Sequence, residues 1–161
     1  MFRFWYRFIP RSMSLINAGK LELAWSGIER GMEQFMGATF EQICLEYLWR
    51  VNGSDLLSWT FSEAGRWWGT DPASRQEAEI DILAHDAASR ALFCECKWSS
   101  AKVGEDILNS LRKKSEIPCF SKLTQRHLVL FSKSGFTPGC VRLATEMGNV
   151  TLLTLDDILA T

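Results

Sequence analysis

The chain has 161 residues, which is the size of one domain or of one domain with a short appendage. Hydrophobic residues make up 47% and charged residues 23% of it, as in an ordinary folded protein and not in a disordered one. The sequence contains no phosphate-binding P-loop, no dinucleotide-binding glycine turn and no apolar run long enough for a membrane span, so it excludes these three features for the chain.

The net charge of −1 is the sum of three unlike segments. Residues 1–30 carry five basic and two acidic side chains, residues 31–100 carry five and eleven, and residues 101–161 carry eight and six. An acidic centre between basic flanks is what a divalent-cation site beside a phosphate-binding surface requires. A solvated acidic surface would give the same pattern, so charge alone leaves both interpretations open.

The N-terminal segment is aromatic, but Arg3, Arg7 and Arg11 interrupt it too often for a signal peptide. Together with an odd number of cysteines, five, this favours a cytoplasmic protein with reduced thiols. Cys94 and Cys96 are expected to be small buried groups, because no second Cys pair or His pair completes a zinc site. The aromatic residues are expected to cover the core or to dock on another domain, and if exposed they favour a homodimer.

Helical periodicity predicts a helix over residues 21–49, broken near Gly31 or Gly37 and ended by the turn at residues 52–54. Its second half carries one apolar stripe, and Glu41 lies at the border of that stripe.

A short strand is predicted over residues 56–61, followed by a loop over residues 65–72. Arg66, Trp67 and Trp68 in this loop have the chemistry to stack on bases. Packing of at least one of the two tryptophans as a lid on the core is the more ordinary expectation.

Residues 79–84 and 91–98 are predicted as two strands of an antiparallel hairpin, with Ile80 and Ile82 on one face of the first. If Asp81 pairs opposite Glu95, then Glu79 falls opposite Lys97, and the four polar side chains share a face. A slip of one residue would scatter them.

The rest of the chain alternates helices and strands. In chain order, the expected elements are a helix over 103–114, a buried strand over 127–131, a helix over 137–148, a strand over 150–154 and a short helix over 156–159. The order of helix, three strands, helix, strand, helix, strand predicts an α/β protein with a mixed central sheet flanked by helices.

The strongest candidate site consists of Asp81, Glu95 and Lys97. Paired carboxylates supply hard oxygen ligands for Mg²⁺ or Mn²⁺, and a neighbouring lysine can orient a water or stabilise charge on a phosphate. An exposed cross-strand ion pair is the structural alternative. The basic run at 112–114 suits phosphates, and it equally suits a solvated helix end.

The spacing of Ile80-Asp81 and Glu95-x-Lys97 resembles the core of the PD-(D/E)XK nuclease superfamily, which has a restriction-endonuclease-like fold with the same order of elements. A set of ordered blocks also resembles the C-terminal domain of archaeal-type AAA ATPases. These blocks are FRFWYRFI at 2–9, G-x-x-F-E at 37–41, RWWG at 66–69, EID at 79–81, ECKW at 95–98 and LFSKSGF at 130–136.

The resemblance implies that Asp81 and Glu95 are metal ligands for Mg²⁺ or Mn²⁺, that Lys97 is the catalytic lysine and that Glu41 is a helix-borne acid completing the site. It also implies a PD-(D/E)XK nuclease-like domain over residues 31–161, preceded by an aromatic segment and linker helix over residues 1–30. Two departures are Ile80 in place of the nominal proline and the absence of the ATPase from this sequence.

Two functions are therefore expected as alternatives. The first is a metal-dependent deoxyribonuclease, and the second is an inactive nuclease-fold domain that acts as a regulatory or interaction module. The implied partners are DNA and an ATPase and winged-helix region of the same or a partner chain, with no membrane.

Overall fold

The computed structural model of the chain describes residues 2–54, 59–72 and 75–160. The chain divides into two compact units, Met1–Thr39 and Phe40–Thr161, and each is described here by itself. Within the described residues, no helix combines the length and the apolar composition that a membrane crossing needs. The predicted domain division at residue 30 stays a prediction.

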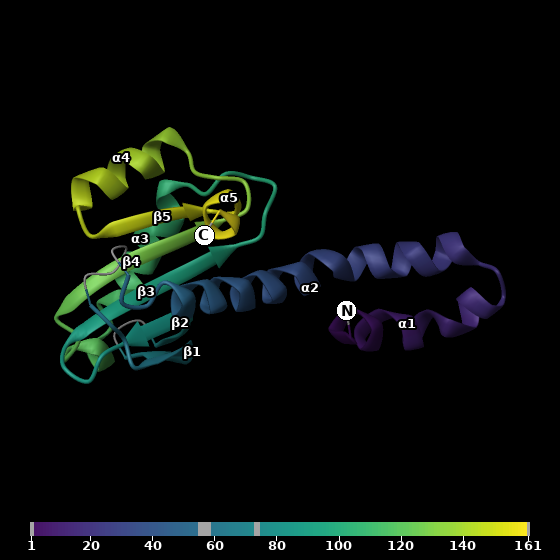
Figure 1. Ribbon diagram of the computed structural model, residues 1–161, viewed down its shortest axis with the longest axis horizontal. Helices are drawn as coiled ribbons and strands as arrows, with labels where there is room; N and C mark the ends of the chain where they lie inside the picture. The colour runs from purple at the N-terminus through teal and green to yellow at the C-terminus, as the bar shows by residue number, and fades with distance from the viewer. Residues whose placement is uncertain (1, 55–58, 73–74, 161) are drawn as a thin grey trace. The chain divides into compact units, whose positions relative to one another are not determined.

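The first unit is a helical hairpin made of α1 (Phe2–Asn17) and the first part of α2 (Leu21–Arg50), as Figure 1 shows. Gly19 allows the tight turn between them, because its φ of 70° lies in the left-handed region that favours glycine. The ring of Phe8 packs edge-on against Phe35, with 5.5 Å between ring centroids. No helix was predicted over this aromatic segment, so α1 is a finding of the structure.

The helix α2 runs without interruption through Gly31 and Gly37, and the expected break is therefore wrong. A glycine inside a helix costs about 1 kcal/mol relative to alanine. At Gly31 that cost has a packing reason, because a Cβ atom there would lie 2.8 Å from Cε1 of Phe8. The glycine lets the two helices approach closely, and periodicity in one helix does not reveal such a contact.

The second unit contains a five-stranded mixed sheet in the order β1-β2-β3-β4-β5. Its strands are β1 (Glu63–Asp71), β2 (Gln76–His85), β3 (Arg90–Lys97), β4 (Gln125–Ser132) and β5 (Val150–Thr154). The first three form an antiparallel meander, and β3, β4 and β5 are parallel. The expected mixed α/β sheet is confirmed.

Helices cover both faces of this sheet (Figure 1). α3 (Glu105–Ser115) and α4 (Pro138–Met147) pack on one face, while the second half of α2 and α5 (Leu155–Leu159) pack on the other. The cluster beneath α2 includes Phe40, Leu48, Ile82, Cys94, Phe131 and Ile158. The cluster beneath α3 and α4 includes Ile80, Phe93, Leu108, Leu111, Leu130 and Cys140.

The start of the meander differs from expectation. Residues 56–58 of the predicted strand 56–61 lie outside the described residues, and residues 59–61 are not in a strand. The predicted loop over 65–72 is instead most of β1. Glycine-rich composition indicated a loop, but the strand is stabilised by pairing with β2 along its length.

The two tryptophans of β1 have different environments. The ring of Trp67 packs against Phe120, with 4.7 Å between centroids, and belongs to the cluster beneath α3 and α4. Trp68 is 76% exposed. The expectation that at least one tryptophan packs on the core is confirmed, and successive side chains on a strand point to opposite faces.

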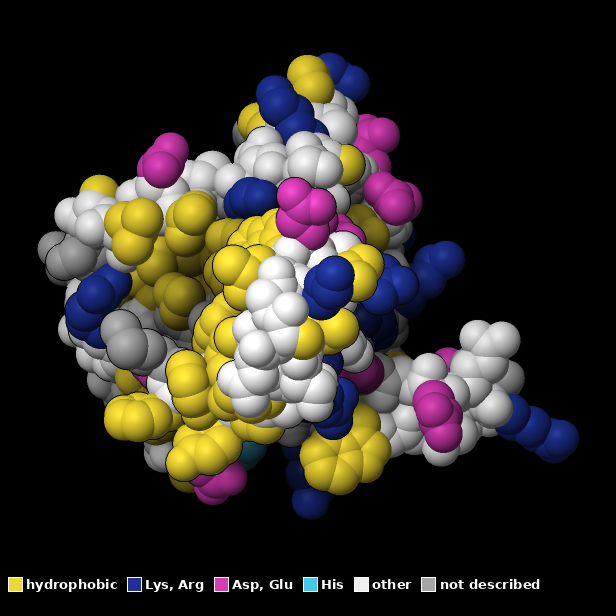
Figure 2. Space-filling view, turned by 90° about the vertical axis from the view of Figure 1, so that its right-hand side faces the viewer, with side chains coloured by type: hydrophobic (Ala, Val, Ile, Leu, Met, Phe, Trp, Pro, Cys, Tyr) yellow, Lys and Arg dark blue, Asp and Glu magenta, His cyan; other side chains and the backbone are white. Residues whose placement is uncertain are grey.

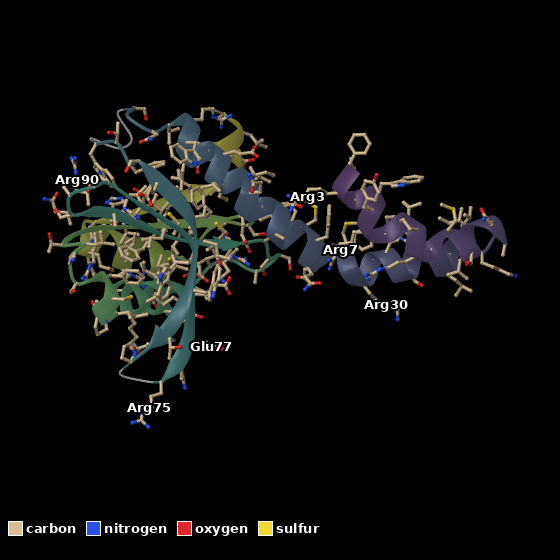
Figure 3. The ribbon with its side chains drawn as sticks, turned by 90° about the horizontal axis from the view of Figure 1, so that it is seen from below. Arg3, Arg7, Arg30, Arg75, Glu77 and Arg90 are labelled. Carbon is tan, nitrogen blue, oxygen red and sulfur yellow. The ribbon has the colours of Figure 1, made fainter. Side chains whose placement is uncertain are left out.

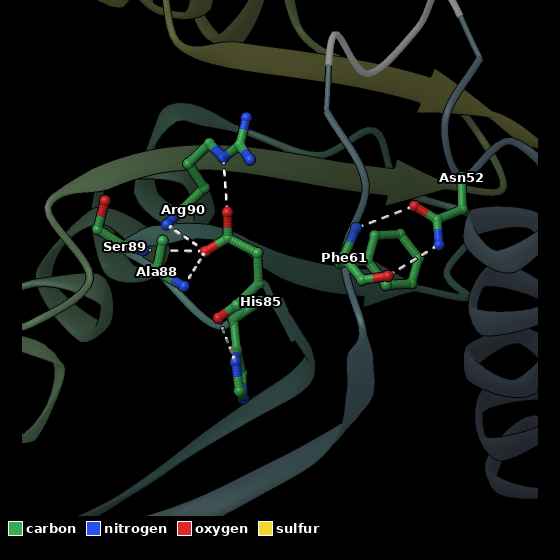
Figure 4. Close-up of polar contacts among 7 residues, drawn as sticks. Asn52, Phe61, His85, Ala88, Ser89 and Arg90 are labelled. Carbon is green, nitrogen blue, oxygen red and sulfur yellow. Dashed lines mark hydrogen bonds and ion pairs between the residues drawn. The ribbon is translucent and has the colours of Figure 1, made fainter.

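Asp86 organises the turn between β2 and β3. Figure 4 labels His85, Ala88, Ser89 and Arg90 of this turn and marks the hydrogen bonds there. Its Oδ1 accepts hydrogen bonds from the backbone N–H groups of Ala88, Ser89 and Arg90 at 2.9, 2.9 and 3.0 Å. Its Oδ2 accepts from Nε of Arg90 at 2.6 Å. These hydrogen bonds lower the pKa of Asp86 to about 2.

We expect Asp86→Asn to lower the melting temperature by several degrees at pH 7. Because the folded pKa is below the unfolded value, the carboxylate contributes stability above about pH 4 and loses it as the pH falls toward 2. Thermal unfolding followed by circular dichroism from pH 7 to pH 2 measures this difference. If the difference in melting temperature between wild type and Asp86→Asn does not become smaller in acid, the stabilising role of the Asp86 carboxylate is contradicted.

Candidate functional site

A β-bulge in β2 lies at the centre of the candidate site. Its flanking pairs are Gly65 with Leu83 and Trp67 with Ile80. One residue of β1, Arg66, therefore stands opposite two residues of β2, Asp81 and Ile82. The bulge shifts the alternation of side chains, so Ile80 and Ile82 pack in different clusters. The expectation that they share a face is wrong for this reason.

The bulge also ends the regular pairing of β2 with β3. Ile82 pairs with Cys94, which confirms the predicted register that places Asp81 next to Glu95. Instead of a backbone carbonyl, Oδ2 of Asp81 accepts the hydrogen bond of the Cys96 N–H at 2.7 Å. The carboxylate is thereby fixed between the two strands where their regular pairing ends.

Glu95 is a buried carboxylate held by two lysines. It is 7% exposed, and Nζ of Lys97 lies 2.6 Å from its Oε1. Nζ of Lys114, from α3, lies 2.9 Å from its Oε2. Two charge-assisted hydrogen bonds offset the cost of burying this charge.

Lys97 was predicted for this site, whereas Lys114 was predicted only as part of a basic run at 112–114. The helical spacing of the sequence indicates that Lys114 shares a face with buried residues of this helix. Lys114 follows the buried Leu111 by three residues, and residues three apart lie on the same face of a helix. Only the packing of α3 on the sheet shows that this lysine reaches Glu95.

Arg66 joins two further acids. Its Nη2 lies 2.5 Å from Oε2 of Glu41, and its Nε lies 2.9 Å from Oε1 of Glu79. Glu41 is thus brought to the same region as Asp81, whose pKa it raises. Glu79 pairs with Trp68 of β1 and binds Arg66. The regular pairing of β2 with β3 ends at Ile82 and Cys94, so the expected pair of Glu79 with Lys97 is not formed. The bulge is the reason, because it breaks the alternation that the expectation assumed.

Asp81 has an abnormally high pKa of about 6. Burial is the largest cause, and the neighbouring charge of Glu95 is the next, while the hydrogen bond from Cys96 opposes both. Burial alone would lower the pKa of Lys97, but the hydrogen bond and charge of Glu95 raise it. Lys97 is therefore a cation and a hydrogen-bond donor at neutral pH, not a general base.

The ion pairs of the described chain distribute charge unevenly. Arg66 pairs with both Glu41 and Glu79, and two lysines pair with Glu95. No Lys or Arg of the described residues forms an ion pair with Asp81. Perturbed carboxylates in such an arrangement are typical of functional sites.

The fit of a divalent cation to this site rests on donor chemistry. Asp81, Glu95 and Glu41 supply carboxylate oxygens, the hard donors that Mg²⁺ prefers, and the charges of Glu95 and Glu41 both raise the pKa of Asp81. Among the residues that the structure describes, no three His, Cys, Asp or Glu side chains already form a ligand set. To bind a cation, Glu41 would have to turn away from Arg66, and Glu95 from Lys97 and Lys114. The metal assignment therefore stays a prediction.

We expect Asp81→Asn to stabilise the metal-free protein at pH 8. Because the pKa of Asp81 is raised in the folded state, the contribution of this group to stability is full below about pH 4 and is lost as the pH rises through about 6. The neutral amide keeps an acceptor for Cys96 and removes this loss, which amounts to about 3 kcal/mol. Urea unfolding at pH 8 and pH 4, with EDTA, measures the difference.

The control is Asp86→Asn, for which the expected effect at neutral pH has the opposite sign. Equal stability of wild type and Asp81→Asn at pH 8 would show that Asp81 is not an abnormal acid.

Known proteins resemble the chain in sequence and in fold. A curated relative, "Uncharacterized protein MJECL04" of Methanocaldococcus jannaschii, is 31% identical over 117 residues, which are 71% of this chain and 25% of the relative. The chain thus spans about a quarter of the length of that relative.

A solved structure, "Crystal Structure of Protein of Unknown Function AF1548", shares the fold with a TM-score of 0.52 at 15% identity, over 80% of this chain and 65% of that one. A second, "Structure of EndoMS-dsDNA2 complex", has a TM-score of 0.39 at 18% identity, over 56% and 36% of the two chains. The second similarity is too weak to support an assignment. Residues 5–116 match the family DUF234, described as "Archaea bacterial proteins of unknown function", and the chain therefore belongs to this family.

Proposed function

We propose that the protein is a metal-dependent deoxyribonuclease domain whose site lies at the bulge of β2. The observation that carries this proposal is the electrostatic coupling of two largely buried carboxylates, Asp81 and Glu95, beside the protonated Lys97. An ordinary fold avoids repulsion between buried acids, because it lowers stability. A buried carboxyl group such as Asp81, with its pKa raised to about 6, is what we would expect in a site that binds a cationic ligand.

In this proposal Asp81 and Glu95 hold Mg²⁺ or Mn²⁺, and Glu41 joins them. When bound, the ion lowers the pKa of a water and offsets negative charge on a phosphodiester. Lys97 donates a hydrogen bond to the phosphate as charge develops on it. Lys114 keeps Glu95 oriented when Lys97 turns toward the substrate, because the two lysines bind different oxygens of that carboxylate.

A cleft beside Lys114 has the charges for a phosphate backbone on one wall. Its volume is about 570 Å³, and its lining includes Ser110, Lys113 and Lys114 of α3 and Glu77 and Glu79 of β2. Figure 3 shows Glu77 on the β1–β2 hairpin. Lysines on α3 would bind phosphates, while the acids of β2 would exclude DNA from the opposite wall.

The second candidate function is an interaction module without turnover. The observation that favours it is the charge balance of the cluster, in which Arg66, Lys97 and Lys114 already pair with three of the four acids. Such a network is stable without an ion. Metal titration separates the two functions, because only the first requires affinity for a divalent cation.

A place beside an ATPase and winged-helix region is also part of the proposal. The ordered blocks that resemble the C-terminal domain of AAA ATPases support it, and so does the greater length of the curated relative. The region would be in the same chain or in a partner chain.

We expect Asp81→Asn and Lys97→Ala to reduce Mg²⁺-dependent cleavage of duplex or single-stranded DNA by roughly 10²- to 10⁴-fold. Calorimetric titration with Mn²⁺ should show that Asp81→Asn loses the metal while Lys97→Ala keeps it. The exposed Lys122, changed to Ala, is the matched control and should leave cleavage unchanged. Undiminished cleavage by Asp81→Asn would remove the site from consideration.

A second expectation concerns Arg66, which competes with a cation for Glu41. Arg66→Gln should tighten Mn²⁺ binding by up to about 5-fold, since a partly exposed ion pair contributes at most about 1 kcal/mol. Calorimetry without DNA measures this. Arg90→Gln, which removes a similar ion pair to Asp86, should not change the affinity. Weaker binding by Arg66→Gln would show that Arg66 organises the ligands instead of competing with the ion.

A further inference from the structure

A groove between α1 and α2 is lined by arginines. It consists of two hollows of about 230 Å³ and 330 Å³, and Arg7 lines both of them. Arg3 lines the first hollow, and Arg11 and Arg30 line the second. These four are all the arginines of the first unit, so the groove collects every one of them. Figure 3 labels Arg3 and Arg7 of α1 and Arg30 of α2.

The positive charge of this arginine groove is not neutralised within the described chain. None of its four arginines forms an ion pair with a described Asp or Glu. Residues 21–39 contain three glutamates, but no described acid lines either hollow. Nη2 of Arg7 donates to Oε1 of Gln34 at 2.7 Å, and its guanidinium lies 5.9 Å from the ring centroid of Phe8. These contacts position Arg7 and leave its charge available to a ligand.

The arginines of α1 form a row with regular spacing. Arg3, Arg7 and Arg11 are four residues apart, and four residues advance an α-helix by about 6 Å and turn it by about 40° beyond a full turn. The three side chains therefore follow the groove. Small residues, among them Gly27 and Ala38, line it beside them and leave it open. A polymer with negative charges at regular intervals can lie along the groove and meet one arginine after another.

The chemistry of this row suits the backbone of a nucleic acid. A guanidinium presents its N–H donors in a planar fork that binds two oxygens of one phosphate. A nucleic-acid strand carries one phosphate per nucleotide, which supplies the repeated charge. The aromatic rings that line the groove, Phe8 and Phe35, pack against each other and are not free to stack on bases. Contacts in the groove would therefore be to phosphates and independent of sequence.

A lipid surface fits the hairpin less well. A helix that lies in a membrane surface buries an apolar face, and the exposed aromatic residues of α1 are Phe2, Trp5 and Tyr6, which line neither hollow. Arg7 follows Trp5 by two residues, which turn a helix by about 200°, so a membrane that held Trp5 would face away from Arg7. Figure 2, which views the hairpin from its turn, shows Lys and Arg side chains as well as hydrophobic ones at the surface. The homodimer expected from the aromatic residues stays a prediction.

We propose that the groove formed by Arg3, Arg7, Arg11 and Arg30 binds the phosphodiester backbone of DNA without sequence preference. The choice of DNA over another polyanion rests on the proposed function of the second unit, which acts on the same polymer. The hairpin then adds affinity for the DNA on which the second unit acts.

A matched pair of variants tests the groove. Arg7→Gln removes one charge inside it, and Lys20→Gln removes the single basic residue of the first unit that lies outside it. Fluorescence anisotropy of a labelled DNA duplex in EDTA measures binding by the full chain without cleavage. At about 0.1 M salt, we expect Arg7→Gln to bind at least ~5-fold more weakly than wild type, and the slope of log affinity against log salt concentration to be smaller by about 0.9. Arg30→Gln, on the other helix, should behave in the same way.

Lys20→Gln should stay within ~2-fold of wild type, because salt screens a distant surface charge. Circular dichroism verifies that each variant is folded. Equal affinity and slope for wild type and both arginine variants, or a wild type that does not bind DNA, would overturn the proposal.

Polyglutamate and vesicles of anionic phospholipid test the competing occupants, an acidic protein and a membrane. Displacement of DNA by polyglutamate at an equal concentration of charge would overturn the assignment to phosphates. Vesicle binding that Arg7→Gln abolishes, with DNA binding unchanged, would overturn the assignment to DNA.

Cleavage assays with Mg²⁺ separate this proposal from the proposed function. If no protein cleaves DNA but Arg7→Gln still binds it more weakly than Lys20→Gln does, the groove is supported and the nuclease is not. If wild type cleaves DNA and Arg7→Gln binds and cleaves it equally well, the groove is overturned and the nuclease is supported.

Discussion

The hydrogen bond from the Cys96 N–H to the Asp81 carboxylate is the contact on which the candidate site depends. It lies where a β-bulge has ended the regular pairing of β2 with β3. In a regular sheet a backbone carbonyl would accept this N–H, and Asp81 would project from one face. The bulge instead fixes the acid between the strands, near Glu95 and Glu41. The β-bulge thus brings together residues that are far apart in the sequence.

Electrostatic balance explains how the protein tolerates so many acids in one place. Three cations, Arg66, Lys97 and Lys114, come from three different elements, and each one binds a carboxylate of the cluster. Asp81 forms none of these ion pairs, and burial and the charge of Glu95 raise its pKa. The cluster therefore has a stable resting form, and a ligand that brings positive charge to Asp81 would favour its ionised form.

The two units use their apolar residues differently. In the second unit, apolar side chains form clusters on both faces of the sheet, beneath the helices that cover them. In the hairpin, two helices can bury only one stripe each, and α1 has a second stripe that contains Trp5 and Tyr6. Two helices alone cannot enclose that surface, so these aromatic side chains stay exposed.

The sequence by itself determined the order of elements from β2 onward, the hairpin of β2 and β3, its register and the grouping of Asp81, Glu95 and Lys97. Alternation of side chains and turn residues are local properties, and they also predicted a helix over 137–148, which the structure shows as α4 with Thr137 as its N-cap and a left-handed Gly148 at its end. Only the tertiary structure decided where Lys114 and Arg66 bind, because each meets an acid from another element. The same holds for the bulge, which depends on two strands together, and for Gly31, whose role is a contact with Phe8 on another helix.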